Sequence, residues 1–263
     1  MESYLTALIY RNTRTSCCSL AVVCARISHD RLQRLLYTHF AWSRRLWEWF
    51  AAAMVREGGS LILDDTCWVR RGGKSKVELA AELLREARRR GMRPKDVLFD
   101  SWYAAATLVH LLDGLGWKYV ARLKSNRLFA GPAVRARWRQ RFGRGVGKLR
   151  NIKHEVCVVK DGRRYFVTND SELSSGAVKA HYRHRQQIEE TFRLLKQEFG
   201  WGGASAQKAP AQRAHLHLGL YALCLVQRQA MANGQTIYAF KRRLFRLPIP
   251  EHLAQLEHLA LAA

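Results

Sequence analysis

Two short apolar segments that each end in aspartate constrain the fold of this chain more than any other feature of its sequence. Residues 61–63 end at a pair of aspartates, and residues 97–99 end at a single one. Between them, residues 74–90 have the spacing of apolar side chains that is typical of an amphipathic helix. A strand, a helix and a strand over this distance predict two parallel strands joined by a right-handed crossover.

The carboxyl ends of parallel strands lie at the same edge of a sheet. Asp64 follows the first strand and Asp100 follows the second, so we expect both carboxylates at that edge. Asp65, the neighbour of Asp64, would point to the opposite face, because side chains alternate along a strand.

The rest of the sequence contains further strands and helices. A strand is expected over residues 117–123, and a hairpin over 156–168, where Asp161 and Gly162 are a favoured tight-turn pair. The first sixty residues and the final third have helical periodicity, and residues 216–230 are expected to be a core helix. This succession predicts an α/β fold.

The basic composition indicates what the protein binds. Lys and Arg number 45 against 21 Asp and Glu, a net charge of +24, for which a polyanion is the natural partner. Residues 114–154 contain no acid, and a segment of one charge sign favours phosphate contact. Gly143, Gly145 and Gly147 are expected to loosen this segment. Its cations are Lys118, Arg122, Lys124, Arg127, Arg135, Arg137, Arg139, Arg141, Arg144, Lys148, Arg150 and Lys153.

Membrane and secreted proteins are excluded by the same sequence. Its longest uncharged apolar stretches, over residues 15–25 and 214–227, fall short of the roughly 20 residues that a spanning helix needs. The N-terminus lacks the pattern of a secretion signal. The cysteines form no Cys-x-x-Cys pair, which favours reduced thiols over a metal site. We therefore expect a cytoplasmic protein with no membrane partner.

Residues 180–199 are expected to form one helix with a polar edge. On a helical wheel, Tyr182, Arg185, Glu189 and Lys196 fall within an arc of about 60° beside an apolar stripe. An ion pair between Arg185 and Glu189 explains those two residues but neither of the others. We interpret this edge as a functional surface from which Glu189 reaches the edge of the sheet.

Three carboxylates at one sheet edge require a cation. Asp64, Asp100 and Glu189 would repel one another and raise each other's pKa values unless a cation neutralised them. Their oxygen atoms select Mg²⁺ or Mn²⁺, and two such ions about 3.5–4 Å apart can activate water and stabilise the leaving oxygen in phosphodiester cleavage. The surrounding Arg and Lys side chains would hold the DNA backbone.

The spacing of these residues resembles that of a known family. Within YRHRQQIEETFRLLK, Tyr182, Arg185, Glu189 and Lys196 match the Tyr-2-Arg-3-Glu-6-Lys (YREK) motif of DDE-type transposases of bacterial insertion sequences. Four fixed residues at fixed spacing make this match specific. The segments ILDDT, VLFDSWY and ARLKSNR also resemble that group, so the resemblance extends from about Ser28 to Gln229.

The resemblance implies an RNase H-like domain, a mixed sheet flanked by helices, in which two aspartates and a glutamate hold two Mg²⁺ or Mn²⁺ ions. Carried over by position, these catalytic metal ligands are Asp64, Asp100 and Glu189. The family often has Asp-x-Thr at the end of its first strand, which selects Asp64 and leaves Asp65 as the alternative. The DNA-contacting residues that the resemblance implies are Tyr182, Arg185 and Lys196.

Two features between these motifs complete the comparison with the family. The basic segment over about 124–170 resembles the β-rich insertion that members of the family have before their catalytic glutamate. RNase H-like domains run three antiparallel strands before their first helix, but here only residues 67–73 separate Thr66 from that helix. Two strands of about five to six residues each, joined by a turn, need a longer segment than this. We therefore expect the second and third strands to be missing and the first to form an exposed edge.

These expectations divide the chain into three parts. Residues 1–60 form a helical region that either binds DNA or presents a solvated basic face. Residues 61–235 form the RNase H-like DDE catalytic domain, and residues 236–263 form a basic C-terminal tail.

The leading hypothesis is a Mg²⁺-dependent transposase that cuts the ends of a mobile element and joins them to target DNA. One alternative is a catalytically inactive DNA-binding remnant that occupies transposon ends and inhibits an intact relative. Another is an RNase H-like nuclease or nucleic-acid-binding protein outside transposition, which leaves the four-residue motif unexplained. The expected partner is DNA, as transposon ends and as target, and a homodimer on DNA is the assembly considered.

Overall fold

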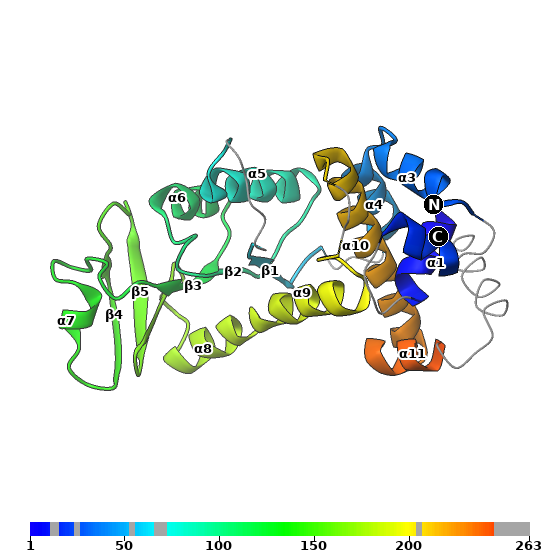
Figure 1. Cartoon of the computed structure of the whole chain (residues 1–263). Helices are drawn as coiled ribbons and strands as arrows, with labels where there is room; N and C mark the ends of the chain where they lie inside the picture. Colours follow the sequence, from blue (N-terminus) through cyan, green and yellow to red (C-terminus); the bar gives the residue numbers. More distant parts are fainter. Residues whose placement is uncertain (11–15, 24–26, 53–55, 66–72, 204–206, 245–263) are drawn as a thin grey trace. The chain divides into compact units, whose positions relative to one another are not determined.

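The structure, a computed structural model, describes residues 1–10, 16–23, 27–52, 56–65, 73–203 and 207–244. Contacts divide the chain into two compact units: the sheet unit, Val55–Glu189, and the helical unit, Met1–Met54 with Glu190–Ala263. Figure 1 labels the elements of both. The three domain ranges expected from the sequence stay predictions, and this division differs from them in grouping residues 190–235 with the N-terminal helices.

The sheet unit is built on a mixed sheet whose described strands follow the order β1-β2-β3-β6-β5-β4. β1, β2 and β3 are parallel, and β6, β5 and β4 join them in antiparallel pairs. The strands are β1 (Ser60–Leu63), β2 (Asp96–Phe99), β3 (Tyr119–Leu123), β4 (Phe142–Lys148), β5 (Glu155–Asp161) and β6 (Arg164–Thr168).

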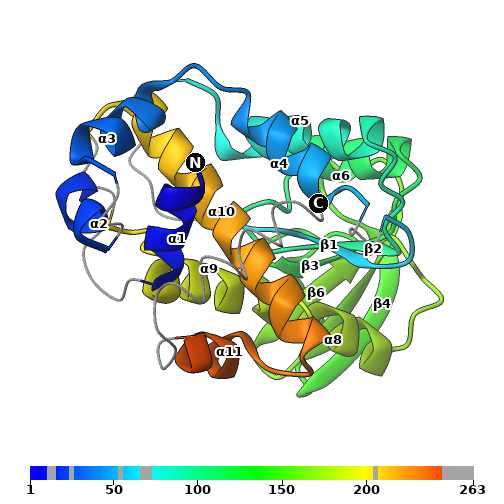
Figure 2. The same cartoon turned by 90° about the vertical axis from the view of Figure 1, so that its right-hand side faces the viewer.

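Helices cover both faces of this sheet, as Figures 1 and 2 show. On one face, α5 (Lys76–Arg89) and α6 (Ala106–Gly114) form a buried cluster with side chains such as Phe99. On the other face, Val178 of α8 (Ser175–Arg183) packs with Leu98 and its neighbours. The expected mixed sheet flanked by helices is therefore confirmed, and it is consistent with an RNase H-like fold.

The predicted crossover from β1 through α5 to the parallel strand β2 is confirmed. Ser75 caps α5, because its side chain accepts a hydrogen bond from the N–H of Glu78 while the Glu78 carboxylate accepts one from the N–H of Ser75. The helix ends before Gly91, whose φ of 76° lies in the left-handed region that glycine adopts readily.

β1 lies at one edge of the described sheet and pairs there with β2. This matches the exposed edge that the sequence predicted for the first strand: Leu63 is buried, whereas Leu61 and Ile62 are half-buried. An edge strand lacks a neighbour on one side, which explains this exposure. No strand lies between β1 and α5 in residues 64–65 and 73–75, and residues 66–72 fall outside the described part of the chain.

The predicted hairpin is confirmed as β5 and β6, which turn at Gly162 with a φ of 58°. β6 also pairs with β3, so the β-rich segment before Glu189 extends the same sheet. The glycines of β4 do not loosen the chain as expected. They form one flat face of the strand, on which the rings of Trp138 and Phe129 lie; the short helix α7 (Val134–Arg137) precedes Trp138.

The helical unit is organised around α10 (Ala209–Ala232), against which α1, α3, α4 and α11 pack. Leu218, Ala222 and Val226 of α10 are buried, which confirms the expected core helix. No helix in the described residues is both long and apolar enough to cross a membrane. The other helices are α1 (Glu2–Tyr10), α2 (Cys17–Val23), α3 (His29–Tyr37), α4 (Trp42–Phe50), α11 (Ile237–Leu244) and the later part of α9 (Gln186–Glu198).

Candidate active site

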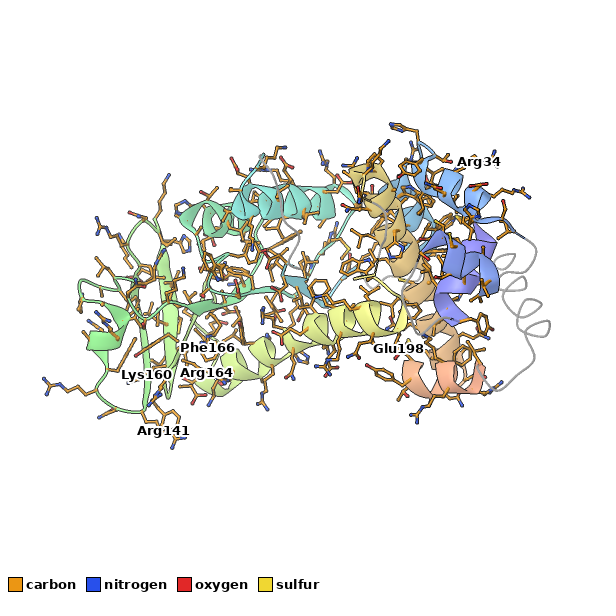
Figure 3. The ribbon with its side chains drawn as sticks, viewed as in Figure 1. Arg34, Arg141, Lys160, Arg164, Phe166 and Glu198 are labelled. Carbon is orange, nitrogen blue, oxygen red and sulfur yellow. The ribbon has the colours of Figure 1, made fainter. Side chains whose placement is uncertain are left out.

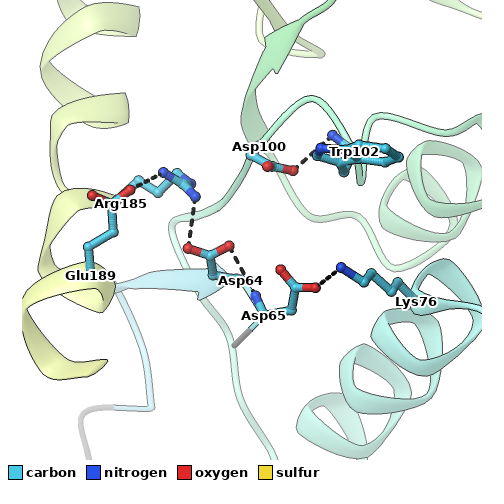
Figure 4. Close-up of polar contacts among 7 residues, drawn as sticks. All are labelled: Asp64, Asp65, Lys76, Asp100, Trp102, Arg185 and Glu189. Atoms are coloured by element: carbon cyan, nitrogen blue, oxygen red, sulfur yellow. Dashed lines mark hydrogen bonds and ion pairs between the residues drawn. The ribbon is translucent and has the colours of Figure 1, made fainter. Parts of the chain in front are cut away.

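The parallel strands bring two predicted acids to one edge of the sheet. Leu63 of β1 pairs with Phe99 of β2, and Asp64 and Asp100 are the residues that follow. Both therefore stand at the carboxyl ends of neighbouring strands, as the sequence predicted. Figure 4 shows them with the polar side chains around them.

One arginine joins two of the three predicted carboxylates. Arg185 donates from Nη2 to Oδ2 of Asp64 at 2.8 Å and from Nη1 to Oε1 of Glu189 at 2.7 Å (Figure 4). The side chains of Arg185 and Asp64 are 15% and 11% exposed, whereas that of Glu189 is 54% exposed. We call this arrangement the Arg185 bridge.

The Arg185 bridge keeps its central cation charged. Burial alone would lower the pKa of the Arg185 guanidinium, but the interactions with Tyr182 and Asp64 and the hydrogen bond with Glu189 together raise it above its ordinary value. The positive charge of Arg185 thus offsets part of the negative charge at this edge.

The structure distinguishes Asp64 from Asp65. Asp65 forms an ion pair with Lys76 at the start of α5, and its side chain is 39% exposed. Its backbone N–H donates to Oδ1 of Asp64 at 3.0 Å, which orients the Asp64 carboxylate. Asp64 faces Arg185 while Asp65 faces α5, which favours Asp64 as the first acid. Thr66, on which the Asp-x-Thr match depends, lies outside the described residues.

Asp100 is held by the loop that follows β2. Its Oδ1 accepts a hydrogen bond from the backbone N–H of Trp102 at 2.8 Å (Figure 4). Trp102 is 70% exposed, and Nζ of Lys124 lies 4.4 Å from the centre of its ring. The carboxylate of Asp100 is thus oriented by backbone, separately from the Arg185 bridge.

The charges of Asp64, Asp65 and Asp100 all affect the pKa of the Tyr103 hydroxyl. Its side chain is buried, and burial is the largest cause that raises the pKa of its hydroxyl to about 12. The charges of Asp65, Asp64 and Asp100 raise this pKa further, while that of Arg185 lowers it. The acids at the two strand ends therefore act on one buried phenol.

Tyr182 lines the site from α8. Its ring meets that of Phe166 on β6 edge-on, with centroids 5.1 Å apart, and the guanidinium of Arg122 lies 5.8 Å from the centre of the Phe166 ring. Burial raises the pKa of the Tyr182 hydroxyl, Arg185 and Arg122 lower it, and Asp100 raises it. The charges of both the cations and the acids of the site therefore act on the Tyr182 hydroxyl.

The sequence did not indicate Tyr103 as a site residue, and it indicated Arg122 only as one cation of the basic segment. A signal for Arg122 was available, because strand alternation places it on the same face of β3 as Val120, which α8 covers. Tyr103 follows β2 by a short loop, and no periodicity indicates the direction of a side chain in such a segment.

The prediction of one helix over residues 180–199 is wrong. α8 ends at Arg183, and α9 spans Gln186–Glu198. In the turn between them, the N–H groups of His184 and Arg185 each bond to the carbonyl three residues earlier at 3.0 Å, which is the tighter 3₁₀ pattern. A wheel with 100° per residue therefore misplaces these side chains relative to one another.

Five of the six predicted site residues belong to the sheet unit, and Lys196 belongs to the helical unit. Lys196 lies on α9, and its side chain is exposed. Its contact with DNA stays a prediction.

Among the described residues, no three His, Cys, Asp or Glu side chains gather closely enough to hold one metal ion. The sequence predicted such a group from Asp64, Asp100 and Glu189. In the structure the guanidinium of Arg185 lies between Asp64 and Glu189, in the position where a metal cation was expected to offset their charges.

Cations and exposed aromatic rings share part of the surface of the sheet unit. Arg141 and Lys179 lie 5.3 Å and 5.7 Å from the centre of the Phe142 ring, which is 55% exposed. Figure 3 shows Arg141 extending away from the strands. Cations of this kind suit a phosphate backbone, and exposed rings suit nucleic-acid bases.

Two family models match the chain. A model described as a transposase DDE domain matches residues 43–225, and one described as a DDE superfamily endonuclease matches residues 1–77. The longer match covers more than half of the chain and includes every predicted site residue. No curated protein matches the chain.

Proposed function

Because this chain belongs to the family of transposase DDE domains, we propose that it cleaves DNA at the ends of a mobile element and joins those ends to target DNA. The observation that carries the proposal is the placement of Asp64 and Asp100 at the ends of neighbouring strands, with Arg185 linking Asp64 to Glu189. The net charge of +24 supports DNA as the substrate.

We propose that Asp64, Asp100 and Glu189 hold two Mg²⁺ or Mn²⁺ ions. Carboxylate oxygens are the ligands that these ions prefer. The charges of Asp64 and Asp100 both raise the pKa of Tyr103, which supports the proximity of the two aspartates to each other. When bound, such ions supply an activated water and stabilise the leaving oxygen of a phosphodiester.

The side chains of the chain itself hold the DNA in this proposal. Arg185 presents planar, parallel N–H donors that match a phosphate group, and Tyr182 and Lys196 are proposed as further contacts to DNA. Arg141, an exposed cation beside the Phe142 ring, binds the backbone farther along and fixes its register without reading its sequence. Together they bring one phosphodiester to the acids.

The test is nicking of DNA that carries the element's terminal sequence, with Mg²⁺ present. Glu189→Gln removes a carboxylate but little volume and should lower the nicking rate by at least about 1000-fold, as expected for a residue of a catalytic unit. Glu190→Gln makes the same change at the next, exposed position and should keep wild-type activity. Equal nicking by the wild type and Glu189→Gln would contradict the assignment of Glu189 as a catalytic residue.

The same assay decides between the two neighbouring aspartates. Asp64→Asn should abolish nicking, whereas Asp65→Asn should retain it, because Asp65 is paired with Lys76 instead of Arg185. Loss of nicking in Asp65→Asn alone would transfer the role to Asp65.

A second candidate is a DNA-binding remnant that occupies transposon ends without cutting them. The edge position of β1, whose described partner is β2 alone, favours it, since β1 carries the first acid. It predicts salt-sensitive DNA binding with no Mg²⁺-dependent nicking by the wild type. DNA binding that is unchanged in Arg185→Ala combined with Lys196→Ala counts against both candidates.

A further inference from the structure

Arg185 is engaged with two of the proposed metal ligands. Its Nη atoms donate to Asp64 and Glu189, but its Nε is buried and has no hydrogen-bond partner among the residues that the structure describes. A buried donor without a partner is an unfavourable state that native proteins rarely keep. The Nε–H of the guanidinium is therefore open to an acceptor that the described residues do not supply.

The Arg185 bridge opposes metal binding at the same site. A guanidinium between two carboxylates repels a divalent cation and occupies oxygen atoms that the ion would use. A phosphate, in contrast, matches the edge of the guanidinium formed by Nε and one Nη. The carboxylates and a DNA phosphate therefore compete for Arg185.

No other described ion pair neutralises both Asp64 and Glu189 as Arg185 does. Lys76 is paired with Asp65, and Asp100 is bound by the backbone N–H of Trp102. Among the described ion pairs, Arg185 is the cation that Asp64 and Glu189 share. A change in its position therefore acts on both carboxylates at once.

We propose that Arg185 couples the binding of DNA to the binding of divalent metal. Without DNA, Arg185 neutralises Asp64 and Glu189 and keeps their affinity for the ion low. A phosphate of the bound end draws the guanidinium away and frees both carboxylates, so that the ion binds tightly only when DNA is in place. This inference rests on the proposed function, since it takes Asp64 and Glu189 as metal ligands and Arg185 as a phosphate contact.

The test measures Mn²⁺ binding from the electron paramagnetic resonance signal of the free ion, with and without a duplex that carries the element's terminal sequence. For the wild type, the duplex should raise the Mn²⁺ affinity about tenfold or more, within the range of ordinary coupling between sites. Because coupling is reciprocal, Mn²⁺ should raise the affinity for the duplex by the same factor.

Arg185→Gln should bind Mn²⁺ more tightly than the wild type without DNA, and the duplex should then change that affinity less than about twofold. Arg183→Gln is the matched control, because it removes the same charge at an exposed position at the end of α8 and should keep the wild-type coupling. Circular dichroism establishes that each variant is folded.

If Arg185→Gln does not fold, Arg185→Lys serves in its place, since a lysine keeps the charge but offers one donor atom instead of a planar pair. It should show weaker coupling than the wild type. The inference is overturned if the duplex leaves the wild-type Mn²⁺ affinity unchanged, if the folded variant keeps full coupling, or if Arg185→Gln binds Mn²⁺ more weakly than the wild type.

Failure of this inference and failure of the proposed function give different results. A protein that nicks DNA but binds Mn²⁺ independently of the duplex and of Arg185 retains the function and loses the coupling. A protein that shows the coupling without nicking retains the coupling and supports the inactive remnant. Absence of Mn²⁺ binding under all conditions refutes the metal assignment itself.

Discussion

At the scale of single residues, the hydroxyl of Tyr103 links the site to the stability of the sheet unit. Burial, followed by the charges of Asp65 and Asp64, raises the pKa of this hydroxyl from 10.0 to about 12. The folded protein therefore binds this proton more tightly than the unfolded chain does. The associated stability is complete below about pH 10 and is lost as the pH rises towards about 12.

Tyr103→Phe should consequently lose less stability than the wild type between about pH 10 and about pH 12, because the substituted ring has no proton to release. Thermal unfolding midpoints measured across this interval test the difference in slope. Tyr37→Phe, at a position that is 41% exposed, should follow the wild-type slope. A Tyr103→Phe curve parallel to the wild type contradicts the assignment.

Which residues could be predicted depends on whether a local pattern specifies their direction. Asp64 and Asp100 follow directly from strand ends, since the crossover of two parallel strands fixes the shared edge. The pairing of Arg185 with Glu189 follows from their spacing, but its bond to Asp64 joins residues far apart in the sequence. Sequence periodicity indicates only contacts between residues close in the chain, so the Arg185 bridge could not be predicted from it.

At the scale of elements, the packing of β4 depends on the absence of Cβ atoms at its glycines. A Cβ atom built on Gly143 would lie 2.5 Å from the ring of Trp138, whereas one on Gly147 would meet the ring of Phe129 at 3.4 Å. The Trp138 and Phe129 rings are themselves stacked, with centroids 5.9 Å apart, so neither moves aside easily. The first glycine is therefore required for this packing and the second is not.

Gly143→Ala should lower the free energy of unfolding by about 1–3 kcal/mol, the usual cost of inserting a methyl group into a packed site. Gly147→Ala should change it by less than about 0.5 kcal/mol, since its contacts are of ordinary length. Urea unfolding of both variants measures the difference. Similar losses in the two variants would show that glycine flexibility, and not the Trp138 ring, sets the requirement.

Helices and strands with clear hydrophobic periodicity and clear end signals were predicted well, whereas the break between α8 and α9 was not. α5 has an apolar stripe, a serine cap and a following glycine, and all three are local. The break between α8 and α9 falls at His184 and Arg185, neither of which is glycine or proline. Both residues are compatible with a helix, so no local signal marks this turn, from which Arg185 reaches Asp64.

At the scale of the whole molecule, the net charge of +24 is the property that the sequence alone determines. It predicts salt-dependent binding to DNA, because each phosphate that a cation neutralises releases a condensed counterion. It does not tell which cations make those contacts. Arg34 on α3 is exposed, as are many cations of the sheet unit, and both groups appear on the surface in Figure 3.

The contribution of the surface near Phe142 can be measured from the salt dependence of DNA affinity. Each lost phosphate contact reduces the slope of log affinity against log salt by about 0.9, so Arg139→Gln combined with Arg141→Gln, two exposed cations that directly precede β4, should reduce it by about 2. Arg89→Gln, on α5, removes a cation that is already paired with Glu86 and should leave the slope unchanged. Fluorescence anisotropy of a labelled duplex between about 50 and 200 mM salt gives all three slopes. An unchanged slope in the double variant would mean that these cations form a solvated face, and the DNA path would then have to follow other cations of the chain.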